Sequence, residues 1–260
     1  MIVRLSGGLC NQMFMWAFGR ALSLERGVPV KYHWARSTWD YALDAYYDAK
    51  VDLTTPTSTA RIYDELGFAF DYGVFTAPLD TYYRGYWQSE KYFYKYADVI
   101  RKELKANPTP NYIAWSLAQE LRSQNSVFVH VRRGDYTNPG TKEFHGTLPW
   151  EYYRDAMNYM REKLNSPKFY FFSDDTKWVR ENFYTDFSLG EWTVISGFNQ
   201  HEDLYLMQNC RHGIMANSTF GWWANWLGEH PDRVCIAPKR WFMNPDINTN
   251  DLIPERWIRI

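Results

Sequence analysis

Short apolar runs alternate with helix-like segments throughout the second half of the chain. Each run is bounded by turn residues, as a buried strand is, and the segments between them repeat their apolar residues at helical spacing. Strands joined through helices pair in parallel, and the helices then cover both faces of the sheet. We therefore predict an α/β fold with strands over 127–131, 168–173, 192–195, 213–216 and 233–237, and helices over 149–165, 175–183, 202–209 and 219–229.

The chain opens with the same kind of unit. A strand over Ile2–Leu5 leads through a glycine turn into a helix over 11–26. Gly27 ends that helix, and a second strand is predicted over 28–32.

The stretch from about residue 37 to residue 110 has weak periodicity and many tyrosine, tryptophan and aspartate residues. We predict mixed helices and loops there, with a loop over 84–89 and a helix over 90–106. The proline-containing break at 107–110 separates two halves. We place them at 1–120 and 121–260, with the option that the C-terminal segment packs back on the first half.

Composition excludes several classes of protein. The chain has 260 residues, 23% of them charged and a formal net charge of −1, which gives no basic surplus for nucleic acid or an anionic membrane. Its three cysteines form no paired motif, which argues against a disulfide framework or a zinc site. No stretch is long and apolar enough to span a membrane, and the start lacks a signal peptide. We expect a cytoplasmic protein, with a peripheral position at the inner membrane face left open.

The most specific motif is HVRRGDY at 130–136, where a predicted strand ends. Ligands of parallel sheets bind at the carboxyl ends of strands. Arg132 and Arg133 beside a turn glycine suit a diphosphate, because a guanidinium group contacts phosphate through two hydrogen bonds. The alternative is a surface ion pair with Asp135, and we treat the Arg-Gly-Asp tripeptide as a coincidence.

A second motif, NSTFGWW at 217–223, follows another predicted strand and opens a helix. Ser218 or Thr219 is suited to cap that helix, and the free N–H groups of the first turn form an anion site. The alternative, that these residues only cap the helix and fill the core with Trp222 and Trp223, is compatible with the first.

Two more strand ends carry polar residues. Asp174 and Asp175 follow the strand over 168–173, and one carboxylate can accept hydrogen bonds from both N1–H and N2–H₂ of guanine; the alternative is helix capping. The segment SGGLCNQ at 6–12 places Asn11 and Gln12 at a helix start, after glycines that let a backbone approach a ligand closely. The chain has no Asp-x-Asp and no histidine cluster, so we expect no metal.

In this order, the four motifs resemble the α-1,2-fucosyltransferases of glycosyltransferase family GT11. The resemblance extends to the segments GYWQSEKYF at 85–93, WEYYRDA at 150–156, DLYLM at 203–207 and IAPKRWF at 236–242. It implies a GT-B fold, with two Rossmann-like halves facing across a cleft, the first on the acceptor side and the second binding the GDP-sugar.

The same resemblance implies transfer of L-fucose from GDP-β-L-fucose with inversion and without metal or cofactor. The acceptor would be an oligosaccharide or glycan, lipid-linked ones included, attacked through the 2-OH of a galactose-like unit. Arg132 would hold the β-phosphate, His130 would shape the nucleotide pocket and Asn11 would touch the sugar or phosphate. Further donor contacts would come from Arg133, from Asp174 or Asp175 at guanine or ribose, from Ser218, Thr219 and the Phe220 amide at the diphosphate, and from Gly8 and Gln12.

The general base is the least defined role. Asp135 is our first choice, and the other candidates are Glu90, His145 and Asp44. The chain also departs from the usual family pattern at three positions, with Cys10 in place of glycine, Gly221 in place of serine and Asn225 at a usually small position.

Other functions fit parts of the sequence. A non-catalytic sugar-binding module would explain the aromatic content of 19%, because flat rings bind sugar faces. A different GT-B sugar-nucleotide transferase, or a protein O-fucosyltransferase, would share the His-x-Arg and Ser-Thr-Phe segments. Tight binding of GDP distinguishes the transferases from the module, and donor and acceptor panels separate the transferases from one another.

Overall fold

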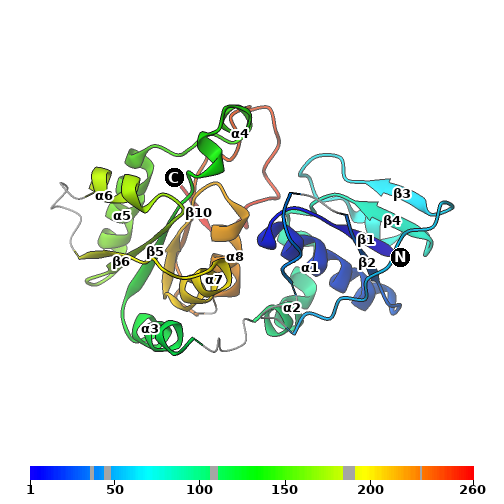
Figure 1. Cartoon of the computed structure of the whole chain (residues 1–260), viewed down its shortest axis with the longest axis horizontal. Helices are drawn as coiled ribbons and strands as arrows, with labels where there is room; N and C mark the ends of the chain where they lie inside the picture. The colour runs from blue at the N-terminus through cyan, green and yellow to red at the C-terminus, as the bar shows by residue number, and fades with distance from the viewer. Residues whose placement is uncertain (36–37, 44–47, 106–110, 184–190, 229) are drawn as a thin grey trace. The chain divides into compact units, whose positions relative to one another are not determined.

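The computed structural model describes residues 1–35, 38–43, 48–105, 111–183, 191–228 and 230–260, which form two compact units (Figure 1). The division at 120/121 that we predicted falls inside helix α3 (Tyr112–Ser123), which belongs wholly to the second unit because it packs on α7 (Gln200–Asn209). The units comprise Met1–Asn107 with Ile247–Pro254, and Pro108–Asp246 with Glu255–Ile260.

The C-terminal region is thus shared between the units. The segment Ile247–Pro254 belongs to the first unit and is held there through Asp251. The Asp251 carboxylate accepts hydrogen bonds from Lys91 Nζ at 2.6 Å and from the Phe70 amide at 2.7 Å. The chain then returns to the second unit and ends in a short strand, β10 (Ile258–Arg259).

Six parallel strands form the sheet of the second unit, in the order β10-β9-β8-β5-β6-β7. From β5 the chain adds β6 and β7 on one side and then β8, β9 and β10 on the other. The switch point therefore lies between the carboxyl ends of β5 and β8, where doubly wound sheets bind ligands. The strands are β5 (Ser126–Val131), β6 (Lys168–Ser173), β7 (Trp192–Val194), β8 (His212–Ile214) and β9 (Cys235–Ala237).

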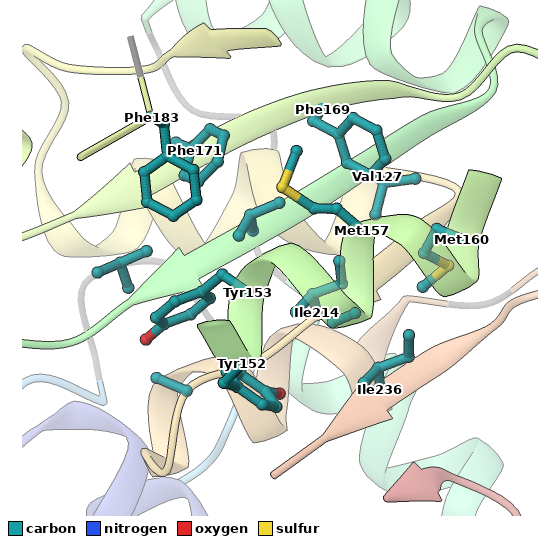
Figure 2. Packing of buried hydrophobic residues seen from close by; sticks show 14 of the residues in the cluster. Val127, Tyr152, Tyr153, Met157, Met160, Phe169, Phe171, Phe183, Ile214 and Ile236 are labelled. Carbon is teal, nitrogen blue, oxygen red and sulfur yellow. The ribbon is translucent and has the colours of Figure 1, made fainter. Parts of the chain in front are cut away.

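Helices cover both faces of this sheet (Figure 1). On one face, α5 (Trp150–Lys163) and α6 (Thr176–Phe183) contribute Tyr153, Met157 and Phe183 to a core with strand residues such as Val127 and Phe171 (Figure 2). The other face carries α3, α7 and α8 (Thr219–Leu227), which pack in that order. Burial on both faces explains why these strands are continuous apolar runs in the sequence.

The first unit has a four-stranded parallel sheet, ordered β2-β1-β4-β3. Helix α1 (Leu9–Arg26) packs on β1, and α2 (Ala97–Leu104) packs on α1. Rings fill its core, with Phe18 stacked on the fully buried Trp87 at 4.3 Å between centroids. The strands are β1 (Ile2–Leu5), β2 (Lys31–Trp34), β3 (Arg61–Asp64) and β4 (Thr81–Arg84), and the short 3₁₀ turns are η1 (Tyr72–Phe75), η2 (Glu90–Tyr92) and η3 (Tyr94–Tyr96).

Several predictions for the first unit were wrong. Strands β3 and β4 lie in the stretch where we predicted only helices and loops. The helix predicted over 90–106 becomes regular only at Ala97, because Tyr92 and Phe93 are buried in the aromatic core and the backbone at Phe93 is not helical. The strand predicted over 28–32 runs from Lys31 to Trp34. No described helix is both long and apolar enough to cross a membrane.

Candidate active site

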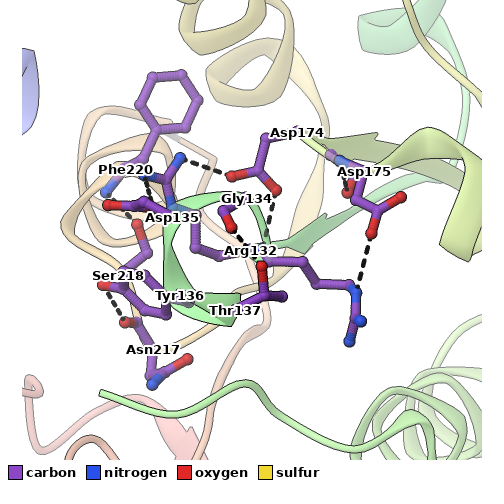
Figure 3. Close-up of polar contacts among 12 residues, drawn as sticks. Arg132, Gly134, Asp135, Tyr136, Thr137, Asp174, Asp175, Asn217, Ser218 and Phe220 are labelled. Atoms are coloured by element: carbon purple, nitrogen blue, oxygen red, sulfur yellow. Dashed lines mark hydrogen bonds and ion pairs between the residues drawn. The ribbon is translucent and has the colours of Figure 1, made fainter. Parts of the chain in front are cut away.

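The polar motifs of the second unit meet at the switch point of its sheet. His130 lies near the end of β5, and the loop that follows contains Arg132, Arg133 and the turn η4 (Asp135–Thr137). Asp174 and Asp175 follow β6, the neighbouring strand, and the Ser218 cap of helix α8 follows β8 on the other side. The predicted gathering of these residues is therefore present (Figure 3).

His130 lies beneath the start of helix α8 and is only 6% exposed. Its ring centroid is 5.5 Å from that of Phe220. Burial lowers the pKa of His130 to about 4, with the Asp174 carboxylate opposing the shift. The imidazole is consequently neutral near pH 7.

Arg132 is held between two carboxylates. Its Nη1 lies 2.8 Å from Asp174 Oδ2 and its Nη2 lies 2.5 Å from Asp135 Oδ1. The guanidinium carbon is 5.4 Å from the centroid of the Tyr136 ring, and the Tyr136 hydroxyl donates to the Asn217 carbonyl at 3.2 Å. These contacts fix the arginine at the switch point, and they include the ion pair with Asp135 that was the alternative interpretation of the motif.

Arg133 points to a different set of partners. Its Nε donates to Asp175 Oδ2 at 3.2 Å, and its guanidinium carbon lies 4.3 Å from the centroid of the Trp178 ring. The two neighbouring arginines, which we predicted to suit a diphosphate, therefore have different partners in this structure. Cation–π and carboxylate contacts instead give Arg133 a structural role at the start of helix α6.

The two aspartates after β6 also have internal partners. Asp174 accepts from Arg132 through Oδ2 and from the Arg133 amide through Oδ1, the latter at 2.8 Å. Asp175 accepts from the Trp178 amide at 3.0 Å, so that it caps α6 while holding Arg133. We had assigned recognition of guanine or ribose to Asp174, with Asp175 as the alternative; in this structure both carboxylates hold the arginine loop. Gly134 lets the loop approach, because a Cβ there would lie 2.6 Å from Asp174 Oδ2.

Helix α8 begins beside Arg132. The Ser218 hydroxyl accepts from the Phe220 amide at 3.3 Å, as the predicted cap, while Thr219 and Phe220 are half-buried. Asn217, which is fully buried, donates through Nδ2 to the carbonyls of His145, Gly146 and Trp241 at 3.0, 3.1 and 3.0 Å. This asparagine therefore ties the helix start to the loops around residues 145–146 and 241.

The predicted residues of the first unit lie at the carboxyl end of β1. Gly8 is the N-cap residue of α1, and a Cβ built on it would lie 3.6 Å from the Trp39 ring. The glycine that the turn requires is Gly7, whose φ is +74°. Asn11 accepts from Gln88 Nε2 at 3.0 Å through Oδ1, and the described residues supply no hydrogen-bond partner for its Nδ2.

Gln12 has a structural role in place of the donor contact that we predicted. It is fully buried, and its Nε2 donates to the carbonyls of Gly7 and Asp40 at 2.8 and 2.9 Å. Its Oε1 accepts from the Ala42 amide at 3.0 Å. The side chain therefore holds two loops together and presents no free amide group to a ligand.

The base candidates differ in position. Asp135 lies beside Arg132 and its side chain is 39% exposed. His145 stacks on Tyr136 at 4.6 Å, and burial lowers its pKa. Glu90 is buried at the start of η2 in the first unit, and Asp44 lies outside the described residues.

The three departures from the family pattern have structural consequences. Cys10 is buried in the first unit, so its side chain adds to the core. Asn225 fits because residue 213 is glycine; a Cβ on Gly213 would come within 2.2 Å of Asn225 Oδ1. Gly221 faces His130, and a Cβ there would lie 2.9 Å from its Nδ1.

One carboxyl group that our sequence analysis did not assign belongs with this edge. Asp203 lies in the first turn of α7, the helix that follows β7 and packs on α8. Burial, followed by the neighbouring Glu202, raises the pKa of Asp203 to about 7, and the described residues supply its side chain with no hydrogen-bond partner. Its place in the first turn of the helix that follows a strand was the available signal.

Within the described part of the chain no group of three or more histidine, cysteine, aspartate and glutamate side chains could hold a metal ion.

Comparisons with known proteins agree with this geometry. The model of "Glycosyl transferase family 11" matches residues 60–260. An α-1,2-colitosyltransferase of Escherichia coli is 32% identical, with 100% of this chain and 98% of the relative covered. Galactoside α-(1,2)-fucosyltransferase 1 of Lagothrix lagotricha is 31% identical, with 68% of this chain and 50% of the relative covered.

Solved structures support the fold. The α-1,6-fucosyltransferase NodZ superposes with a TM-score of 0.54 at 12% identity, covering 87% of this chain and 91% of NodZ. A mutant of Arabidopsis thaliana FUT1 bound to GDP gives 0.53 at 13% identity, covering 90% of this chain and 69% of that one. The α/β fold is therefore GT-B, and the chain, a glycosyltransferase, belongs to glycosyl transferase family 11.

Proposed function

We propose that the chain transfers L-fucose, or a closely related 6-deoxy-L-sugar, from its GDP derivative to the 2-OH of a β-galactoside, with inversion and without a metal. The observation that carries this proposal is the placement of Arg132 beside the capped start of helix α8 at the switch point of the second sheet. Both the colitosyltransferase and the fucosyltransferase relatives have names that specify a 1,2 linkage, which supports the regiochemistry.

The proposed catalysis rests on charge stabilisation. When the bond between sugar C1 and the β-phosphate oxygen breaks, negative charge grows on the departing GDP. The Arg132 guanidinium and the first-turn N–H groups of α8 lie where they can stabilise that charge. The acceptor hydroxyl oxygen attacks C1 from the opposite face and its proton passes to a base.

Phosphate binding requires an exchange at Arg132. Among the charged groups of the loop, the carboxylates of Asp135, Asp174 and Asp175 outnumber the two arginines. Asp174 is held by a second bond to the Arg133 amide, whereas Asp135 is the more exposed partner. We therefore assign Asp135 as the carboxylate that yields to the β-phosphate. It can act as the base only if the released side chain turns to the acceptor face of C1.

Guanine recognition falls to another carboxylate in this proposal. Asp174 and Asp175 are engaged with the arginine loop, whereas Asp203 has no partner among the described side chains. A buried carboxyl group with a raised pKa gains most from a partner that donates two hydrogen bonds, such as N1–H and N2–H₂ of guanine.

The identity of the donor sugar is the open choice. Colitose is L-fucose without its 3-hydroxyl group, so one pocket can hold either sugar, and the relative that covers the whole chain is a colitosyltransferase. A site that hydrogen-bonds the 3-hydroxyl would reject colitose strongly, and a site that does not would discriminate little.

The test is release of GDP from GDP-fucose and from GDP-colitose, in the presence of EDTA, with β-galactosides as acceptors and a control without acceptor. We expect acceptor-dependent release with a 1,2-linked product. Release only with added divalent cation would overturn the metal independence, and release only with a non-guanine sugar nucleotide would overturn the donor class. Binding of GDP with no turnover on any of these acceptors would keep the nucleotide site and overturn the acceptor class, whereas failure to bind GDP would support the sugar-binding alternative.

A further inference from the structure

Helix α8 comes unusually close to the His130 ring. A Cβ built on Gly221 would lie 2.9 Å from His130 Nδ1 and 2.8 Å from Met215 Cβ. Real Cβ atoms do not tolerate such distances, and neither neighbour is the free end of a flexible side chain. Only glycine at position 221 permits this approach of the helix to the strand.

The approach closes one nitrogen of the ring. Of the two ring nitrogens of His130, only Nδ1 is a buried atom without a hydrogen-bond partner. The direction in which a Cβ would leave Gly221 leads to Nδ1, so a Cα hydrogen of this glycine occupies that space. The closed nitrogen therefore faces a C–H group at the positive start of a helix.

This surrounding selects a tautomer. A proton on Nδ1 would be a buried N–H group with no acceptor, which costs more than a buried lone pair and is rare in folded proteins. The positive end of α8 opposes an N–H dipole pointing at it and favours a lone pair. The uncharged ring then carries its proton on Nε2, the nitrogen that is not closed.

We propose that Gly221 is a positioning residue which, by letting α8 cover Nδ1, fixes His130 as an Nε2–H donor toward an acceptor atom of the bound nucleotide. The inference rests on the proposed function only in naming a nucleotide as the ligand. It assigns a role to the departure from serine at position 221, and the role depends on the missing Cβ.

The consequence for binding is specific. A fixed Nε2–H donor matches an oxygen or ring-nitrogen acceptor on the nucleotide and mismatches a group that donates. A side chain at position 221 must push the imidazole or the helix start aside. Either shift misplaces the donor by a fraction of an ångström or more, and a displacement of that size weakens a hydrogen bond steeply.

The first experiment reads the tautomer without any ligand. Long-range proton–nitrogen correlation spectra of isotope-labelled histidine distinguish Nε2–H from Nδ1–H, and His130→Gln assigns the signal among the six histidines. We expect the Nε2–H form in the parent chain and a shift toward a mixture in Gly221→Ala. Finding the Nδ1–H form in the parent would overturn the proposal.

The second experiment measures GDP binding by calorimetry. Gly221→Ala should weaken it by about tenfold, the equivalent of one hydrogen bond. The matched control is Gly140→Ala, also in a helix, where a Cβ would meet no atom within 4 Å and binding should be unchanged. Equal affinity in Gly221→Ala and the parent, with the fold intact by circular dichroism, contradicts the proposal.

Substitutions of His130 separate the two ring nitrogens. Glutamine can place its amide nitrogen near the position of Nε2, whereas asparagine reaches only the position of Nδ1. We expect His130→Gln to retain GDP binding within a few-fold and His130→Asn to lose it by tenfold or more; the reverse order would contradict the assignment. If the parent chain binds no GDP, the proposed function fails, while the ligand-free spectra still decide the tautomer.

Discussion

The carboxyl ends of the two parallel sheets carry different chemistry. At the second sheet, charged side chains are bound to one another around Arg132, beside the start of helix α8. At the first sheet, the end of β1 carries the neutral amides of Asn11 and Gln88 and the half-exposed Trp39 ring, while the Arg84–Asp64 ion pair lies at the ends of β4 and β3. Under the proposed function, the charged end would bind the diphosphate and the amides at the end of β1 would bind uncharged hydroxyl groups.

Arg132→Ala should give the largest effect, because it removes the cation at the charged end. We expect a loss of about 3 kcal/mol in transition-state stabilisation, or roughly 10²–10³ in kcat. Arg133→Ala is the matched control and should cost less than about tenfold, since that guanidinium is held by Asp175 and Trp178. Steady-state kinetics of GDP release decide this, and equal losses in both variants would show that the arginines act as one site.

Asp135→Asn tests whether the anion beside Arg132 is exchanged for phosphate. The substitution removes a negative charge that competes with the nucleotide, so GDP should bind as tightly or more tightly. If Asp135 also accepts the proton, kcat should fall by about 10²-fold or more. Calorimetry and single-turnover rates separate the two effects. Weaker GDP binding would contradict the exchange, and an unchanged rate would move the base role to His145.

Asn11→Ala tests the uncharged end. Its Nδ2 has no partner among the described residues, so we expect the loss of one neutral hydrogen bond, about 1 kcal/mol, seen as a several-fold rise in KM with little change in GDP affinity. Gln88→Ala should reproduce part of the effect, because Gln88 holds Asn11 in place. A large fall in GDP affinity in either variant would remove the distinction between the two ends.

Stability at low pH depends on the buried ring of His130, at the charged end. The pKa of His130 is about 4 in the folded chain, below the ordinary 6.5, so the unfolded chain binds more protons between these values. The free energy of unfolding should therefore fall as the pH is lowered from about 6.5 to 4, by up to about 1.4 kcal/mol per pH unit for this group. Urea unfolding at several pH values measures it. His130→Gln should make the slope shallower, and an unchanged slope would show that the ring is not buried in its neutral form.

The second unit was predictable because its strands are buried on both faces. Runs such as 127–131 and 168–173 are mostly apolar, and the helices between them have clear periodicity. The first unit was less predictable. Strand β4, with the sequence TYYR, is short and rich in tyrosine, so its pattern does not distinguish it from a loop. Its identity depends on pairing with β1 and β3, which is a non-local contact.

The sequence by itself determined the α/β class, the motifs and the strand ends on which they lie. It could do so because apolar periodicity and capping residues act locally. Only the tertiary structure decided what each polar side chain does. Gln12 and Asn11 are neighbours in one motif, yet the Gln12 amide is saturated inside the unit, whereas the Asn11 Nδ2 has no partner among the residues that the structure describes. Arg132 and Arg133 likewise diverge to different carboxylates, because partners brought from other strands, and not the residue type, determine where a charge is held.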